Sequence, residues 1–202
     1  MTKPLALTLG EPAGIGPDIT LAAWLGRGKH ALPPFYLIGD PDWLAKRAAA
    51  LGLDVPIAEV EPDQAIGHFP RALPVLRLDR RATAAPGKPD ASSGPVAIAS
   101  INRAVADVIG GQAAAVVTNP IAKSVLYKSG FAEPGHTEYL AKKSFELTGN
   151  PAWPVMMLWS PEVAVVPVTI HIPYKEVPDH LTRDLVFETG RVVAQDLSLI
   201  HI

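Results

Sequence analysis

The side chains best suited to chemistry lie in one stretch, residues 113–140, with the sequence AAAVVTNPIAKSVLYKSGFAEPGHTEYL. This stretch contains a lysine, Lys123, and a Gly-His-Thr-Glu segment that includes His136 and Thr137. Ammonium, imidazole and hydroxyl groups can all donate hydrogen bonds. The chemistry that these residues indicate is therefore the binding of an anion, such as a phosphate.

The elements expected around these side chains would place them at one edge of a sheet. Residues 113–117 are apolar and end in two valines, which is typical of a central parallel strand covered on both faces. The Thr-Asn-Pro turn at residues 118–120 follows at the carboxyl end of that strand, where open α/β sheets bind ligands. A helix is expected from residue 120 or 121 to about 128, with Lys123 in its first turn.

A second helix is expected to begin near His136 and Thr137. Pro134 and Gly135 break the preceding structure, so either residue would lie at or beside the N-cap. Free backbone N–H groups and the helix dipole make such a position a natural anion site. A simpler alternative is that Thr137 only caps the helix and His136 is an exposed loop residue. A lone Gly-His-Thr segment leaves both interpretations open.

A further candidate, His171, lies near the end of the apolar segment 163–173, VAVVPVTIHIP, which is predicted to be a strand. Because Ile170 and Ile172 flank it, its side chain would point to the opposite face from theirs. An imidazole there can ligate a metal ion or form a structural hydrogen bond. Its distance in sequence from His136 is too long for a local metal motif, so spacing leaves both roles open.

Four motifs, taken in order and spacing, resemble a single family: GEPAGIGPD at residues 10–18, TNPIAKS at 118–124, GHTEYLA at 135–141 and TIHIP at 169–173. That family is the 4-hydroxythreonine-4-phosphate dehydrogenases, and the resemblance covers nearly the whole chain. It implies an α/β fold, a three-layer sandwich like those of isocitrate and isopropylmalate dehydrogenases, incomplete in this chain. It also implies an enzyme of pyridoxal phosphate biosynthesis that oxidises 4-phosphohydroxy-L-threonine with NAD or NADP and decarboxylates the product to an aminoketone phosphate.

The same resemblance implies roles for particular residues. His136 and Thr137 would bind the substrate, and His171 would ligate a divalent ion such as zinc, magnesium or cobalt. Such an ion would lower the pKa of the substrate hydroxyl and position it for hydride transfer. Lys123 is a possible extra charge partner, whereas no residue is assigned as catalytic or as a cofactor ligand.

Two other metal histidines of the family, in Asn-Pro-His-Ala-Gly-Glu and His-Asp-Gln-Gly motifs, do not occur in these 202 residues. In the family one of them comes from the partner subunit, so the implied site belongs to a homodimer. Residues 1–197 are therefore expected to be the N-terminal part of the enzyme, inactive alone. Residues 198–202 are expected to be a non-native tail. The alternatives are a paralogue that oxidises another phosphorylated four-carbon acid or a dihydrodiol, and a non-catalytic fragment.

Composition limits the classes of partner. With 48% hydrophobic and 19% charged residues, a net charge of −2 and a pI near 6.3, the chain is expected to be globular, without a basic surface for nucleic acid. The absence of cysteine excludes disulfides, cysteine-ligated metals and a thiol nucleophile. We expect a cytoplasmic protein, because the sequence contains neither a signal peptide nor a long apolar run.

The first motif follows a predicted strand at residues 5–9 and precedes a predicted helix at 18–25. It is not a dinucleotide-binding fingerprint, because Ile19 replaces the third glycine, and it lacks the Lys-Ser/Thr pair of a P-loop. The glycines permit positive φ and close approach of a ligand, so the segment is either a tight turn or part of the cleft. The resemblance favours the cleft, without a defined role for Glu11.

The remaining elements are expected to alternate between strand and helix, as in an α/β layer. Asp40 is predicted to be an N-cap, residues 54–90 a variable connection, and Met156, Met157 and Trp159 core residues. The expected elements are a strand at 35–38, a helix at 42–51, extended pieces at 55–60 and 75–78, a helix at 91–108, a hairpin of 155–159 with 163–172, a loop at 174–180 and a helix at 181–197.

Overall fold

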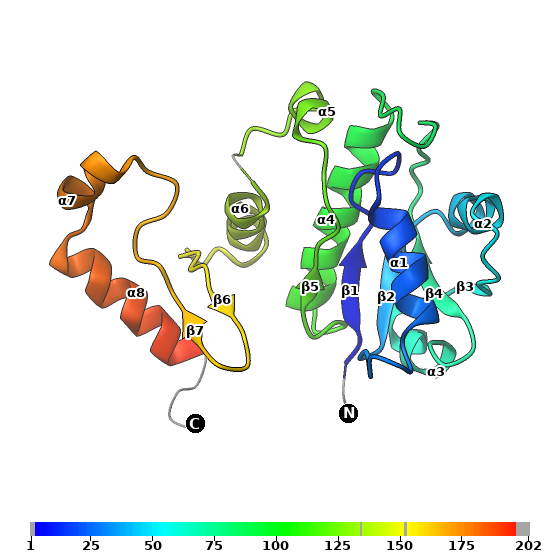
Figure 1. Ribbon diagram of the computed structural model, residues 1–202, viewed down its shortest axis with the longest axis horizontal. Helices are drawn as coiled ribbons and strands as arrows, with labels where there is room; N and C mark the ends of the chain where they lie inside the picture. Colours follow the sequence, from blue (N-terminus) through cyan, green and yellow to red (C-terminus); the bar gives the residue numbers. More distant parts are fainter. Residues whose placement is uncertain (1–2, 134, 152, 197–202) are drawn as a thin grey trace. The chain divides into compact units, whose positions relative to one another are not determined.

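The computed structural model describes residues 3–133, 135–151 and 153–196 (Figure 1). The chain divides into two compact units, residues 1–150 and 151–202. The predicted break at Pro134 and the predicted non-native tail at 198–202 lie outside the described residues. Within the described part, no helix is both long enough and apolar enough to cross a bilayer.

The first unit is built on a five-stranded parallel sheet in the order β3-β4-β2-β1-β5. This arrangement confirms the α/β class, because parallel neighbours require crossover connections. The strands are β1 (Leu5–Thr8), β2 (Phe35–Gly39), β3 (Ile57–Glu59), β4 (Leu73–Arg77) and β5 (Val116–Val117). The helical segments are α1 (Gly16–Leu25), α2 (Pro41–Ala50), the 3-10 helix η1 (Pro62–Gln64), α3 (Ala65–His68), α4 (Ser93–Ile109), α5 (Lys123–Lys128) and α6 (His136–Thr148).

Alternating residues along the strands produce three layers. Leu7 and Leu37 pack with the apolar side chains of α1 and α2, whereas Ala6 and Tyr36 share a second cluster with Ala104 of α4. Successive strand side chains point to opposite faces, so β1 and β2 are covered on both sides. A third cluster joins α4 to α5 and α6, so the helices that carry Lys123 and His136 rest on α4.

Two strand predictions need correction. The extended pieces predicted at 55–60 and 75–78 are confirmed as β3 and β4. Residues 54–90 are nevertheless not a variable connection, because β4 pairs with strands on both sides. The strand predicted at the centre of the sheet, residues 113–117, is parallel but consists only of β5, which pairs with β1 alone at the end of the described sheet. An apolar cavity of about 360 Å³ lies beside it, lined by residues that include Leu7, Ile19 and Val117. A continuous apolar run indicates burial but does not specify how many neighbouring strands cover it.

The second unit contains a short antiparallel hairpin of β6 (Leu158–Trp159) and β7 (Ala164–Val165). The predicted hairpin is therefore confirmed, although its strands are shorter than expected. Trp159 is 71% exposed, so its assignment to the core is wrong. The predicted loop at 174–180 instead contains the 3-10 helix η2 (Tyr174–Glu176) and α7 (Val177–His180), and α8 (Arg183–Asp196) follows it.

Candidate functional site

The glycine loop after β1 and the turn after β5 are held against each other. Gly10 has a φ of 70°, and a Cβ atom at this position would lie 2.5 Å from the carbonyl oxygen of Pro120. That carbonyl also accepts a 2.8 Å hydrogen bond from the backbone N–H of Glu11. Glycine is therefore required at residue 10 for both its φ and its lack of a side chain.

Asn119 fixes the turn after β5 to the first strand and the first helix. Its side-chain amide donates to the carbonyl of Thr8 and to the hydroxyl of Thr20, both at 2.9 Å, and its backbone N–H donates to the Thr8 hydroxyl at 3.1 Å. All three residues are buried. The sequence indicated a turn here, but the amide bonds depend on contacts between residues about a hundred positions apart.

Glu11, which carried no predicted role, is also buried. Its Oε1 atom accepts a 3.0 Å hydrogen bond from the backbone N–H of Ala13. This contact stabilises the loop locally.

His136 and Thr137 are the first two residues of α6, and Gly135 occupies the N-cap position. The alternative in which Thr137 caps the helix is therefore wrong, and its side chain is exposed. His136 is partly buried within the helix and is not a loop residue. The structure therefore places an imidazole and an exposed hydroxyl together at the positive end of a 13-residue helix.

The His136 ring has a distinctive environment. Its Nε2 atom is buried and has no hydrogen-bond partner among the described residues. Burial of the ring, and then the nearby charge of Lys123, lower the pKa of His136 below its ordinary value. The imidazole is therefore neutral at pH 7, when one ring nitrogen donates and the other accepts.

His171 lies in the second unit, in a bend between β7 and η2. The prediction that it lies near the end of a strand is wrong, because β7 ends at Val165 and the backbone at His171 has a φ of 56°. Its side chain is exposed. Positive φ is uncommon for a residue other than glycine, and strained residues of this kind cluster at functional sites. Among the residues that the structure describes, no group of three histidine, cysteine or acidic side chains could hold a metal ion.

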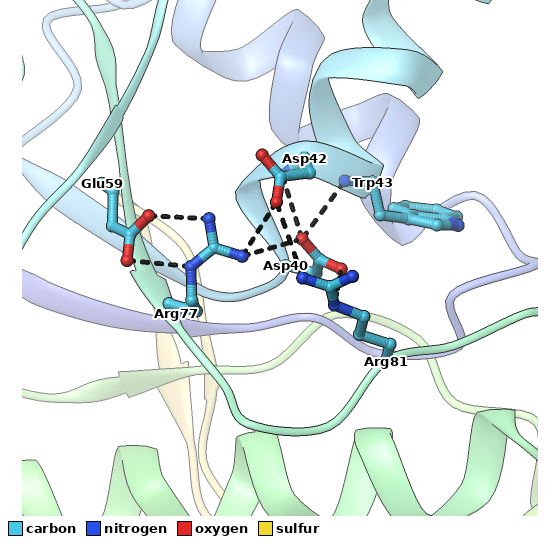
Figure 2. A network of polar contacts seen from close by, with 6 residues as sticks. All are labelled: Asp40, Asp42, Trp43, Glu59, Arg77 and Arg81. Atoms are coloured by element: carbon cyan, nitrogen blue, oxygen red, sulfur yellow. Dashed lines mark hydrogen bonds and ion pairs between the residues drawn. The ribbon is translucent and has the colours of Figure 1, made fainter.

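A separate charged network lies at the carboxyl ends of β2, β3 and β4 (Figure 2). Arg77 forms an ion pair with Glu59 at 2.7 Å, with Asp42 at 3.0 Å and with Asp40 at 3.4 Å. Its hydrogen bonds lower the pKa values of the Asp42 and Glu59 carboxyls. Three carboxylates already surround this guanidinium. The network is therefore a structural set of ion pairs and not an anion site.

Comparison with known proteins identifies the family. The family model described as "Pyridoxal phosphate biosynthetic protein PdxA" matches residues 31–202. The chain belongs to this family. A curated relative, the 4-hydroxythreonine-4-phosphate dehydrogenase of Xanthobacter autotrophicus, is 56% identical over 196 residues. That alignment covers 96% of this chain and 56% of the relative, so the chain spans little more than half of the relative's length.

Solved structures agree with the PdxA family assignment. A 4-hydroxythreonine-4-phosphate dehydrogenase from Klebsiella pneumoniae has a TM-score of 0.80 and 27% identity, covering 98% of this chain and 60% of that one. A terephthalate 1,2-cis-dihydrodiol dehydrogenase from Burkholderia xenovorans LB400 shares the fold, with a TM-score of 0.66 and 22% identity, covering 100% of this chain and 59% of that one.

The structure places three of the sequence-derived candidates in the first unit of this chain. Lys123, His136 and Thr137 belong to the first unit, on helices that both pack against α4. His171 belongs to the second unit. Sequence reasoning recognised each residue type but missed the influence of Lys123 on the His136 ring, because two helices separated by a loop create it.

Proposed function

We propose that this chain forms the substrate-binding part of a 4-hydroxythreonine-4-phosphate dehydrogenase of pyridoxal phosphate biosynthesis. The reaction is the oxidation of 4-phosphohydroxy-L-threonine with NAD or NADP, followed by decarboxylation to an aminoketone phosphate. The observation that carries this proposal is the start of α6 in a chain of the PdxA family, where neutral His136 and exposed Thr137 lie at the positive helix end.

The chain's own residues would bind and orient the substrate. The Thr137 hydroxyl and the free N–H groups at the start of α6 can donate hydrogen bonds to an anionic oxygen. The buried Nε2 atom of His136 gains a partner when a polar group of the substrate reaches it. Burying an unpaired polar atom is unfavourable, so this position favours a ligand that satisfies it.

We also propose His171 as one ligand of a divalent ion, which would be zinc, magnesium or cobalt. Its exposed imidazole and positive φ support this role. The described residues provide no complete set of ligands around it, so the remaining ligands must come from elsewhere in the assembled protein. When bound, such an ion supplies Lewis acidity toward the substrate hydroxyl.

The assembly that follows from this proposal is a cytoplasmic homodimer that binds a small phosphorylated substrate and a nicotinamide cofactor. This chain contains no cysteine, so it offers no thiolate ligand to a metal ion. The formal net charge of −2 of this chain favours a partner other than nucleic acid.

Substitution of Thr137 tests the substrate site. The chain extended to the full length of its PdxA relatives should oxidise 4-phosphohydroxy-L-threonine, and Thr137→Val should lower kcat/KM by roughly ten- to a hundred-fold, because one charge-assisted hydrogen bond is lost. Its melting temperature should stay within about a few degrees, since Thr137 is exposed and is not the cap.

Thr148→Val, at the other end of α6, is the matched control and should leave kcat/KM unchanged. Unchanged kcat/KM in Thr137→Val would contradict the assignment. Turnover of a dihydrodiol in preference to the phosphorylated substrate would favour the activity named for the structurally similar Burkholderia xenovorans enzyme.

A further inference from the structure

The free edge of β5 differs from the other edge of the same sheet. β5 pairs with β1 alone, so within the described residues no strand bonds to its other side (Figure 1). Residues 108–122, which contain β5, include no charged side chain. At the opposite edge, β3 carries Glu59, which forms an ion pair with Arg77. Proteins usually protect edge strands with charges, so the free and uncharged edge of β5 is typical of a strand that has two neighbours.

The face of β5 that lies toward α1 is uncovered as well. Leu7 of β1 pairs in register with Val117, so both side chains lie on the α1 face of the sheet. They line the apolar cavity of about 360 Å³ together with Ile19 and Ala23 of α1. Protein interiors are packed as densely as organic crystals, so an apolar opening of this size beside the core indicates a surface that another element completes.

The opposite face of β5 is already covered. Val116 packs against the apolar clusters that contain Ala104 and Ile101 of α4. α4 therefore covers this end of the sheet on one side, whereas the α1 side of β5 borders the open cavity. The sheet lacks a neighbouring strand and the cover of one face at the same place.

The length of the relatives indicates what occupies this place. The 202-residue chain matches 56% of the Xanthobacter relative and 60% of the Klebsiella structure, so about two-fifths of each of these proteins has no counterpart here. That length easily contains a strand, since strands usually have about three to ten residues. A second copy of this chain fits less well, because its own β5 would bring only the alanine and valine side chains that border the same opening and would leave both cavities unfilled.

We propose that the free edge of β5 and the adjacent cavity form the docking surface for a strand from the part of the protein outside these 202 residues. This strand hydrogen-bonds to β5, and its apolar side chains fill the cavity beside Leu7 and Val117. β5 is then an internal strand, as its continuously apolar sequence indicates. The inference does not depend on the proposed reaction, because it concerns only how the sheet is completed.

A single cysteine tests this docking surface, because the chain has none of its own. Val117→Cys is made in the 202-residue chain and in the chain extended to the full length of its PdxA relatives, and its rate of reaction with a water-soluble maleimide is measured. In the 202-residue chain we expect the rate of an exposed thiol. In the extended chain the rate should fall by about ten-fold or more and recover in denaturant.

Leu51→Cys is the matched control, since Leu51, at the end of α2, is 40% exposed and Val117 is 41% exposed. Its rate should be the same in both proteins. Equal rates for Val117→Cys in the two proteins would overturn the proposal. Slow labelling of Val117→Cys in the 202-residue chain would overturn it too: a dependence on protein concentration would assign the surface to a second copy, and independence would assign it to the second unit of the same chain.

Hydrogen exchange shows whether the docked element is a strand. Pairing with β5 protects the backbone amides on its free side, so exchange within residues 114–118 should slow by about ten-fold or more in the extended chain. Residues 57–59 of β3, at the other edge, should exchange alike in both proteins. Unchanged exchange within 114–118 would overturn the proposal even if the thiol is protected. Neither measurement uses enzymatic activity, so failure of the proposed function would leave both results unaffected.

Discussion

The half-buried ring of His136 illustrates how single residues determine the chemistry of this site. A histidine at the surface would be partly protonated near neutral pH, whereas burial and the charge of Lys123 keep this one neutral. Nearby, Asn119 uses its amide to join β1, α1 and the turn after β5. The two residues differ in role: Asn119 has partners for its amide, whereas the Nε2 atom of His136 has none among the described residues.

The lowered pKa of His136 predicts a pH dependence of stability. As the pH falls below the roughly 6.5 of an unperturbed imidazole, the unfolded chain binds this proton before the folded chain does. The neutral His136 ring therefore makes its full contribution to the free energy of unfolding above about pH 6.5. That contribution is lost as the pH falls through the lower pKa of the folded protein. In urea unfolding, His136→Gln should reduce the loss of stability between about pH 7.5 and 5.5.

His68→Gln is the matched control, since His68 is exposed at the end of α3. That variant should keep the wild-type pH dependence. Identical profiles of unfolding free energy against pH for the wild type and His136→Gln would show that protonation of this ring is not coupled to folding.

The elements around the sheet are stabilised at their ends by charged and polar side chains. Asp40 caps α2, because its Oδ1 atom accepts hydrogen bonds from the backbone N–H groups of Asp42 and Trp43. It also belongs to the charged network around Arg77 (Figure 2). A single carboxylate thus joins the start of α2 to the end of β4, and the sequence predicted only its capping role.

Substitutions at Asp40 separate these two roles. Asp40→Ala should lower the free energy of unfolding by about 1 kcal/mol, and up to about 2, because the cap is lost. Asp40→Asn keeps an oxygen that can cap the helix and should cost less than Asp40→Ala. Denaturant unfolding of both variants provides the comparison. Equal losses would show that the ion pair with Arg77, and not the cap, stabilises this junction.

At the scale of the whole molecule, the candidate residues are distributed over two units. The first unit carries the proposed substrate residues on a three-layer α/β framework, and the second carries His171 with a small hairpin and α8. The described residues contain no complete metal-binding group. The PdxA relative from Xanthobacter is longer, since the alignment covers 56% of it. The proposed activity therefore belongs to the assembled full-length protein.

This distribution predicts weak metal binding by the 202-residue chain alone. One imidazole provides a single ligand, whereas stable divalent sites in proteins use three or more. Titration with Co²⁺, followed by calorimetry, should show binding much weaker than that of the full-length protein, and no ordinary turnover with NAD or NADP. In the full-length protein, His171→Ala should weaken Co²⁺ binding. Tight, stoichiometric binding by the 202-residue chain would contradict this prediction.

The sequence by itself determined the α/β class, the strands at β1 and β2, the cap at Asp40, and the residue types of the candidate site. These features depend on local periodicity, turn residues and short motifs, which act over a few neighbouring residues. Tertiary structure decided that β5 ends the described sheet, that β4 is an internal strand, and that His171 adopts a positive φ in a bend. It also decided that the charge of Lys123 helps to lower the pKa of His136. Pairing, burial and electrostatic interaction depend on which distant segments pack together, and local sequence patterns do not specify that packing.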